Sequence, residues 1–131
     1  MPPELFLDRS LGRRVVAAAL RDAGLSVRTM AEVYGDREQT VADDEWLERA
    51  GREDWIVLAK DKRFRYRRAE LEAIVQHGVK AFVLTSGNLT GAEQAKRFLG
   101  NIERIRAAAA QPGPCVYSVQ VRRIERLWPK S

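Results

Sequence analysis

Short apolar runs alternate along this chain with segments in which apolar residues recur every three or four positions. The runs predict buried strands, and the recurring spacing predicts helices that pack one face against a sheet. The run "WIVLA" at residues 55–59 has no polar alternation, as expected for a strand covered on both faces. The pattern predicts strands at residues 5–7, 26–33, 55–59 and from 80 onward, and helices at residues 15–23, 46–50, 71–75 and 92–105.

Turn and capping residues mark where these elements end. Gly24, Gly51 and Gly78 follow three of the predicted helices, and Thr90 with Glu93 predicts a capping box that opens the longest one. The break "QPGP" at residues 111–114 precedes a β-rich segment that forms either one strand or a terminal hairpin. Strands that alternate with helices in this way predict an α/β fold with a mainly parallel sheet.

The length and composition narrow the class of protein. The 131 residues predict a single domain over residues 1–131, with a core at about residues 5–110 and a C-terminal β segment at 115–128. Lysine and arginine outnumber the acids by 23 to 18, which gives a net charge of +5 and favours an anionic partner such as nucleic acid. The lone Cys115 excludes an internal disulfide, and no apolar stretch is long enough to span a membrane, so we expect a cytoplasmic protein without membrane contact.

Acidic side chains follow the predicted strands at one edge of the sheet. Asp8 ends the first strand, Asp61 ends the third, and Asp43 with Asp44 opens the second helix, while Asn88 lies just past the fourth strand. Ligands of open parallel sheets gather beyond the carboxyl ends of the strands, where such loops converge. Carboxylates that meet there without countercharges favour a bound cation, and oxygen ligands favour Mg²⁺ or Mn²⁺.

Basic residues surround the same edge. An ion of this kind activates water for phosphodiester cleavage, and neighbouring cations hold the phosphates of a nucleic acid. A run of charges of this type is also what an ordinary solvated surface contains. The residues predicted to contact RNA are Arg9, Lys60, Lys62, Arg63 and Arg65.

Each acid also has a purely structural interpretation. Asp8 suits the N-cap of a helix, and one of Asp43 and Asp44 suits the cap of the helix that contains "EWLERA". Asp61 could instead form a surface ion pair with a neighbouring lysine, worth about 0–1 kcal/mol. The metal hypothesis rests on the joint placement of these acids.

Three segments together resemble the PIN-like domains, relatives of the PilT N-terminus nucleases that include the VapC-type toxins. They are "LFLDRSLG", "ADDEWLERAGREDWIVLAKDKRF" and "FVLTSGNLTGAE", and the resemblance runs from Leu5 to about Arg106. It implies a three-layer α/β/α sandwich, a sheet of four to five strands, and Mg²⁺- or Mn²⁺-dependent RNA cleavage. It also implies that Asp8, Asp43 and Asp61 are catalytic and bind metal, with Asp44 as a neighbouring ligand.

The chain departs from the family pattern at the fourth acidic position. Asn88 stands where an Asp is common, and Glu93 is the only later acid nearby, so both are assigned to the rim of the site. One fewer negative charge weakens the case for a second metal ion.

The leading hypothesis is therefore a metal-dependent endoribonuclease, the toxin of a bacterial toxin–antitoxin pair, with a cognate antitoxin and self-association into a homodimer as further expectations. One alternative is a non-catalytic PIN-like module that binds RNA or protein. The other is a receiver-like phospho-acceptor domain, because acids after the first and third strands with Thr85 after the fourth also suit a receiver pocket.

Overall fold

The computed structural model describes residues 4–12, 14–60 and 68–129. None of the helices in these ranges is long and apolar enough to cross a bilayer. The strands are β1 (Leu5–Leu7), β2 (Val27–Thr29), β3 (Ile56–Lys60), β4 (Lys80–Leu84), β5 (Cys115–Val119) and β6 (Ile124–Trp128). The helices are η1 (Arg9–Leu11), α1 (Val15–Asp22), α2 (Met30–Tyr34), η2 (Gly35–Arg37), α3 (Asp43–Arg52), α4 (Arg68–His77), α5 (Gly91–Gly100) and α6 (Ile102–Ala109).

The described strands form one sheet in the order β2-β1-β3-β4-β5-β6. All neighbouring strands run parallel except β6, which pairs antiparallel with β5. The predicted α/β class with a mainly parallel sheet is confirmed. The sheet has six strands, more than the four to five expected, because the C-terminal segment forms a hairpin rather than one strand.

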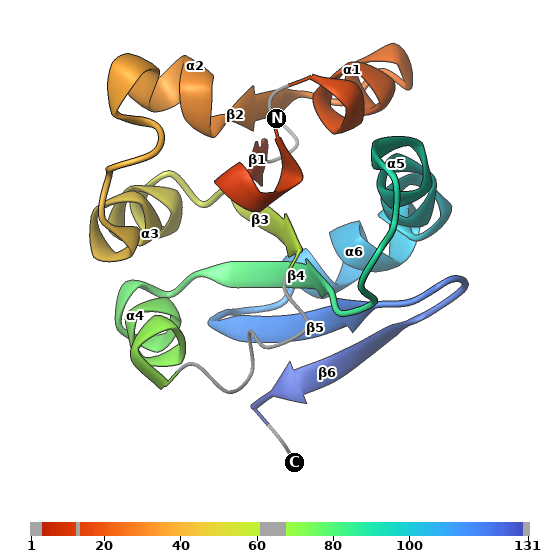
Figure 1. The fold of residues 1–131 in the computed structure, drawn as a ribbon. Coiled ribbons are helices and arrows are strands. Elements are labelled where there is room, and N and C mark those ends of the chain that lie inside the picture. Colours follow the sequence, from red (N-terminus) through yellow and green to blue (C-terminus); the bar gives the residue numbers. More distant parts are fainter. Residues whose placement is uncertain (1–3, 13, 61–67, 130–131) are drawn as a thin grey trace.

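Helices cover both faces of the sheet. Figure 1 shows α3 and α4 on one side and α1, α5 and α6 on the other. Because successive side chains of a strand point to opposite faces, Phe6 packs into the layer that contains α3 and α4, while Leu5 and Leu7 pack against α1. Phe6 is fully buried and stacks on Trp46 and Trp55, with ring centroids 5.5 and 4.9 Å away. This alternation explains the continuous apolar runs seen in the sequence.

The segment predicted as a strand at residues 26–33 divides into a strand and a helix. The side chain of Thr29 accepts a hydrogen bond from the Glu32 N–H, and the Glu32 carboxylate accepts one from the Thr29 N–H at 2.9 Å. This capping box starts α2 immediately after β2, so the strand prediction is wrong beyond Thr29.

The helix predicted to continue to residue 105 is two helices, α5 and α6, that meet at Asn101. The Asn101 side chain is fully buried, and its amide donates to the carbonyl oxygens of Arg97 at 2.9 Å and Gln120 at 2.6 Å. A buried amide requires such partners, and Gln120 belongs to the β5–β6 hairpin. The break thus lies at a Gly-Asn pair, a sequence that favours the end of a helix, and a tertiary contact holds the Asn101 side chain there.

Candidate functional site

Asp8 lies directly after β1 at the carboxyl edge of the sheet. Its backbone N–H donates to the Leu58 carbonyl at 3.0 Å, which continues the pairing with β3. The partly buried carboxylate caps η1 by accepting from the Ser10 N–H, and it also accepts from the Ser10 hydroxyl at 2.7 Å. The predicted capping role of Asp8 is thus confirmed, and it leaves the carboxylate at the edge where a ligand site was predicted.

Ser10 connects Asp8 to the end of β3. While its hydroxyl donates to Asp8, the same oxygen accepts a hydrogen bond from the Lys60 backbone N–H at 3.0 Å. Lys60 is 50 residues away in the sequence. Sequence reasoning did not select Ser10, although an Asp followed two residues later by a Ser is a common local capping pattern.

The electrostatic setting of Asp8 disfavours its charged form. Burial is the largest influence and raises the pKa of the carboxyl group, while hydrogen bonds from Ser10 and the positive charge of Arg9 lower it by less. A carboxylate that has lost solvent without gaining a full countercharge attracts a cation.

Arg9 links the end of β1 to the chain that leads into α3. Its guanidinium donates to the Glu38 carbonyl at 3.0 Å and to the Val41 carbonyl at 2.7 Å. A third nitrogen lies 3.7 Å from the Asp43 carboxylate. Much of the hydrogen-bonding capacity of Arg9 is therefore directed inward, and its contact with RNA stays a prediction.

Asp43 and Asp44 lie in the first turn of α3, whose N-cap is Ala42. The structural interpretation that one of them caps this helix is therefore wrong. Asp43 accepts a hydrogen bond from the Trp46 indole at 3.1 Å, whereas Asp44 pairs with His77 on α4 at 2.9 Å. Successive helical side chains point about 100° apart, so the two carboxylates bond to different partners.

Both of these acids line a pocket of about 340 Å³ between α3 and α4. Glu70 and Glu72 of α4 line the same pocket, and sequence reasoning missed both because they lie outside the strand-end pattern. Four acidic residues thus line the pocket. Two of their carboxylates already have hydrogen-bond partners in the protein, because Asp43 accepts from Trp46 and Asp44 pairs with His77.

The rim residues occupy the loop and first turn after β4. Asn88 is exposed and has a φ of 64°, a left-handed conformation that asparagine tolerates in turns. Glu93 forms the predicted capping box, in which its carboxylate accepts from the Thr90 N–H at 2.8 Å. This backbone hydrogen bond is the main reason why the pKa of Glu93 is lowered.

Asp61, Lys62, Arg63 and Arg65 lie outside the described residues, so their predicted roles stay predictions. Within the described ranges, no group of three or more His, Cys, Asp or Glu residues is placed to hold a metal ion. The structure brings Asp8, Ser10 and the backbone of Lys60 together at one edge of the sheet. Asp43 is connected to this edge by its 3.7 Å contact with Arg9.

Comparisons with known proteins give two matches. A family model described as a PIN like domain matches residues 3–86, a range that includes Asp8, Asp43, Asp44 and Asp61 and stops before Asn88. A Mycobacterium tuberculosis protein named "Putative ribonuclease VapC45" is 33% identical over 124 residues, covering 94% of this chain and 90% of that protein. No solved structure shows a significant match.

Proposed function

Because this chain belongs to the PIN-like domain family, as its sequence motifs predicted, we propose that it is a metal-dependent endoribonuclease and the toxin of a bacterial toxin–antitoxin pair. Similarity to a protein named as a ribonuclease over nearly the full length of both chains supports this function. The structural observation that carries it is the partly buried Asp8 carboxylate, held at the carboxyl edge of the parallel sheet within the matched segment.

The donor chemistry at this edge fits a hard divalent cation. Family members generally use a divalent metal ion, and the acids near Asp8 offer only oxygen ligands. Asp8, Asp43 and Asp61 would hold Mg²⁺ or Mn²⁺, with Asp44 as a neighbour. The chemistry that such an ion supplies is activation of water and neutralisation of charge on the phosphodiester.

The protein's own contribution is to orient the acids. Ser10 holds the Asp8 carboxylate against the end of β3, and the Trp46 indole holds the Asp43 carboxylate on α3. Arg9 joins these two parts through the Glu38 and Val41 carbonyls. We propose that Lys60, Lys62, Arg63 and Arg65 bind the phosphates of the RNA nearby, because cations there would offset the charge of the strand.

One alternative retains a specific structural argument. Asp8 caps η1, Asp43 accepts from Trp46, and Asp44 pairs with His77, so each has a role in folding that a non-catalytic RNA- or protein-binding module would also need. The family assignment gives no support to the receiver-like alternative.

Cleavage of single-stranded RNA in Mg²⁺ or Mn²⁺, and in EDTA, tests the proposal. Wild type should cleave only with the metal, and Asp8→Asn and Asp61→Asn should each lose at least a hundredfold in rate. Asp22→Asn is the matched control, because Asp22 is an exposed acid at the end of α1, on the opposite edge of the sheet. Equal cleavage by Asp8→Asn and wild type would refute the assignment of the site, and a wild type that binds RNA without cutting it would favour the non-catalytic module.

The toxin role predicts a cognate antitoxin and a cytoplasmic site of action. Expression of wild type in a bacterial host should arrest growth, and co-expression of the antitoxin should restore it. The Asp8→Asn variant, which we expect to fold without being active, should allow growth by itself. Self-association remains a prediction, which the solution mass of the purified protein would test.

A further inference from the structure

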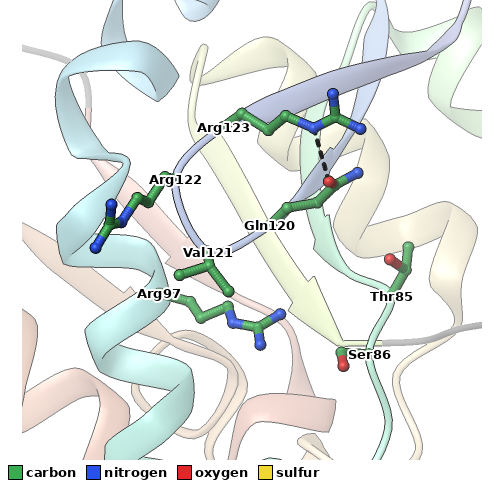
Figure 2. Close-up of a pocket in the computed structure, with 7 residues that line it drawn as sticks. All are labelled: Thr85, Ser86, Arg97, Gln120, Val121, Arg122 and Arg123. Atoms are coloured by element: carbon green, nitrogen blue, oxygen red, sulfur yellow. Dashed lines mark hydrogen bonds between the residues drawn. The ribbon is translucent and has the colours of Figure 1, made fainter.

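A second pocket, of about 500 Å³, lies between the turn of the β5–β6 hairpin, the loop after β4 and the middle of α5 (Figure 2). Arg97 extends from α5 toward the loop that carries Ser86, and Arg123 lies along the hairpin. Arg122 extends from the other side of the hairpin turn. The polar residues of the lining are Thr85, Ser86, Arg97, Gln120, Arg122 and Arg123.

The lining carries three guanidinium groups and no carboxylate. Arg123 is held by Gln120 at 2.8 Å and by Glu125 at 3.3 Å. Within the described ranges, the side chains of Arg97 and Arg122 form no hydrogen bond or ion pair. The charge of Arg97 helps to lower the pKa of Glu93, so this carboxylate, which also accepts from the Thr90 N–H, lies close enough to interact with Arg97. The pocket therefore has an excess of positive charge, with three guanidinium groups against the two adjacent carboxylates of Glu93 and Glu125.

The pocket opens on the same edge of the sheet as Asp8. Asp8 follows β1, Thr85 follows β4 and Gln120 follows β5. In the sheet, β1, β3, β4 and β5 are successive neighbours that all run parallel, so the residues after them lie at one edge. Neighbouring strands are about 4.8 Å apart, and β4 and β5 lie two and three strands from β1. Measured across the sheet, the pocket therefore extends from roughly 10 Å to roughly 14 Å from the end of β1. A strand of nucleic acid that lies along this edge can therefore reach both places.

The donors in the pocket match the phosphates of such a strand. Guanidinium groups bind phosphate oxygens through paired hydrogen bonds, and the Thr85 and Ser86 hydroxyls are further donors. The lining offers no aromatic platform on which a base could stack. We propose that this pocket binds the phosphodiester backbone of the RNA beside the cleavage site and so sets the direction in which the strand crosses the Asp8 edge. This inference rests on the proposed ribonuclease function and deepens it.

Binding of a fluorescent single-stranded RNA 12-mer in EDTA, measured by anisotropy over a range of salt concentrations, tests the proposal without cleavage. Arg97→Gln/Arg122→Gln should weaken binding on the order of tenfold at low salt. It should also reduce the slope of log K against log salt by about 1.4, because about 0.7 is lost for each phosphate contact on a single strand. Arg122→Gln alone, on an exposed turn, should give about half of that change in slope.

The matched control is Arg52→Gln/Arg106→Gln, which removes the same charge. These two arginines lie toward the C-terminal ends of α3 and α6, and pair only with Glu48 and Glu103 of their own helices in the described structure. The control should bind RNA like wild type, with an unchanged salt slope. In the cleavage assay, the pocket variant should raise KM.

The outcomes separate this inference from the function on which it rests. If wild type cleaves RNA and the pocket variant matches the control in affinity, salt slope and KM, the inference is overturned while the ribonuclease function stands. An acidic protein segment as the true occupant would give this same result. If wild type does not cleave RNA with either metal, the proposed ribonuclease function is refuted, and with it the inference that the pocket binds RNA beside a cleavage site.

Discussion

The Ser10 hydroxyl donates a 2.7 Å hydrogen bond to the Asp8 carboxylate and, at the same oxygen, accepts the Lys60 N–H at 3.0 Å. The end of β1 is thereby joined to the end of β3 through one small side chain. This contact sets the orientation of the carboxylate on which the proposed chemistry depends.

Ser10→Ala should lower the rate of RNA cleavage by roughly ten- to a hundredfold, because a hydrogen bond to a charged group is worth roughly 1.5–3 kcal/mol and orients the carboxylate. Ser10→Thr retains the hydroxyl and should recover most of the rate. Steady-state kinetics of both variants would check this, together with the affinity for Mn²⁺. Equal rates for Ser10→Ala and wild type would show that Ser10 has no positioning role.

Asp8→Asn should raise the melting temperature in EDTA at neutral pH. Burial raises the pKa of Asp8, so its contribution to stability is fully present below the pKa of the unfolded chain and is lost as the pH rises through the higher pKa of the folded protein. At neutral pH the ionised carboxylate is therefore destabilising, and Asn removes the charge. Thermal melts with and without Mn²⁺ would test this, since the metal should stabilise wild type more than the variant; a lower melting temperature for the variant in EDTA would contradict the expectation.

Asn101→Leu should destabilise the protein by about 2–4 kcal/mol. The substitution leaves the Arg97 and Gln120 carbonyls without the buried amide donor that joins α5 to the hairpin. Urea unfolding would measure the loss. Arg106→Leu, on the exposed face of α6 with an exposed ion pair to Glu103, is the control and should change stability by less than about 0.5 kcal/mol.

Gly51→Ala should cost about 1–3 kcal/mol, because a Cβ at this position would collide with the His77 backbone carbonyl where α3 and α4 pack. Gly100→Ala is the matched helical substitution, since its Cβ would come no closer than 3.8 Å to the Val121 carbonyl. That variant should be neutral or gain up to about 1 kcal/mol from helix propensity. Equal urea midpoints for the two variants would contradict the close approach of α3 and α4.

Local patterns were sufficient to predict the α/β class, because strand and helix periodicities are properties of neighbouring residues. "LFLD" placed Asp8 at the end of a strand, and parallel strands share one carboxyl edge, so the edge at which Asp8 lies also followed from the sequence. The capping box at Thr90 was predicted for the same reason, since its partner Glu93 is only three residues away.

Contacts between distant segments could be decided only by the tertiary structure. Ser10 meets Lys60 because β1 and β3 are neighbours in the sheet, and Arg9 reaches Glu38 and Val41 because α3 packs beside that edge. The hydrogen bond from Asn101 to Gln120 and the arginine pocket both depend on where the β5–β6 hairpin lies against α5. Periodicity carries no information about which segments become neighbours, since strand order and layer packing are set by burial of the whole core.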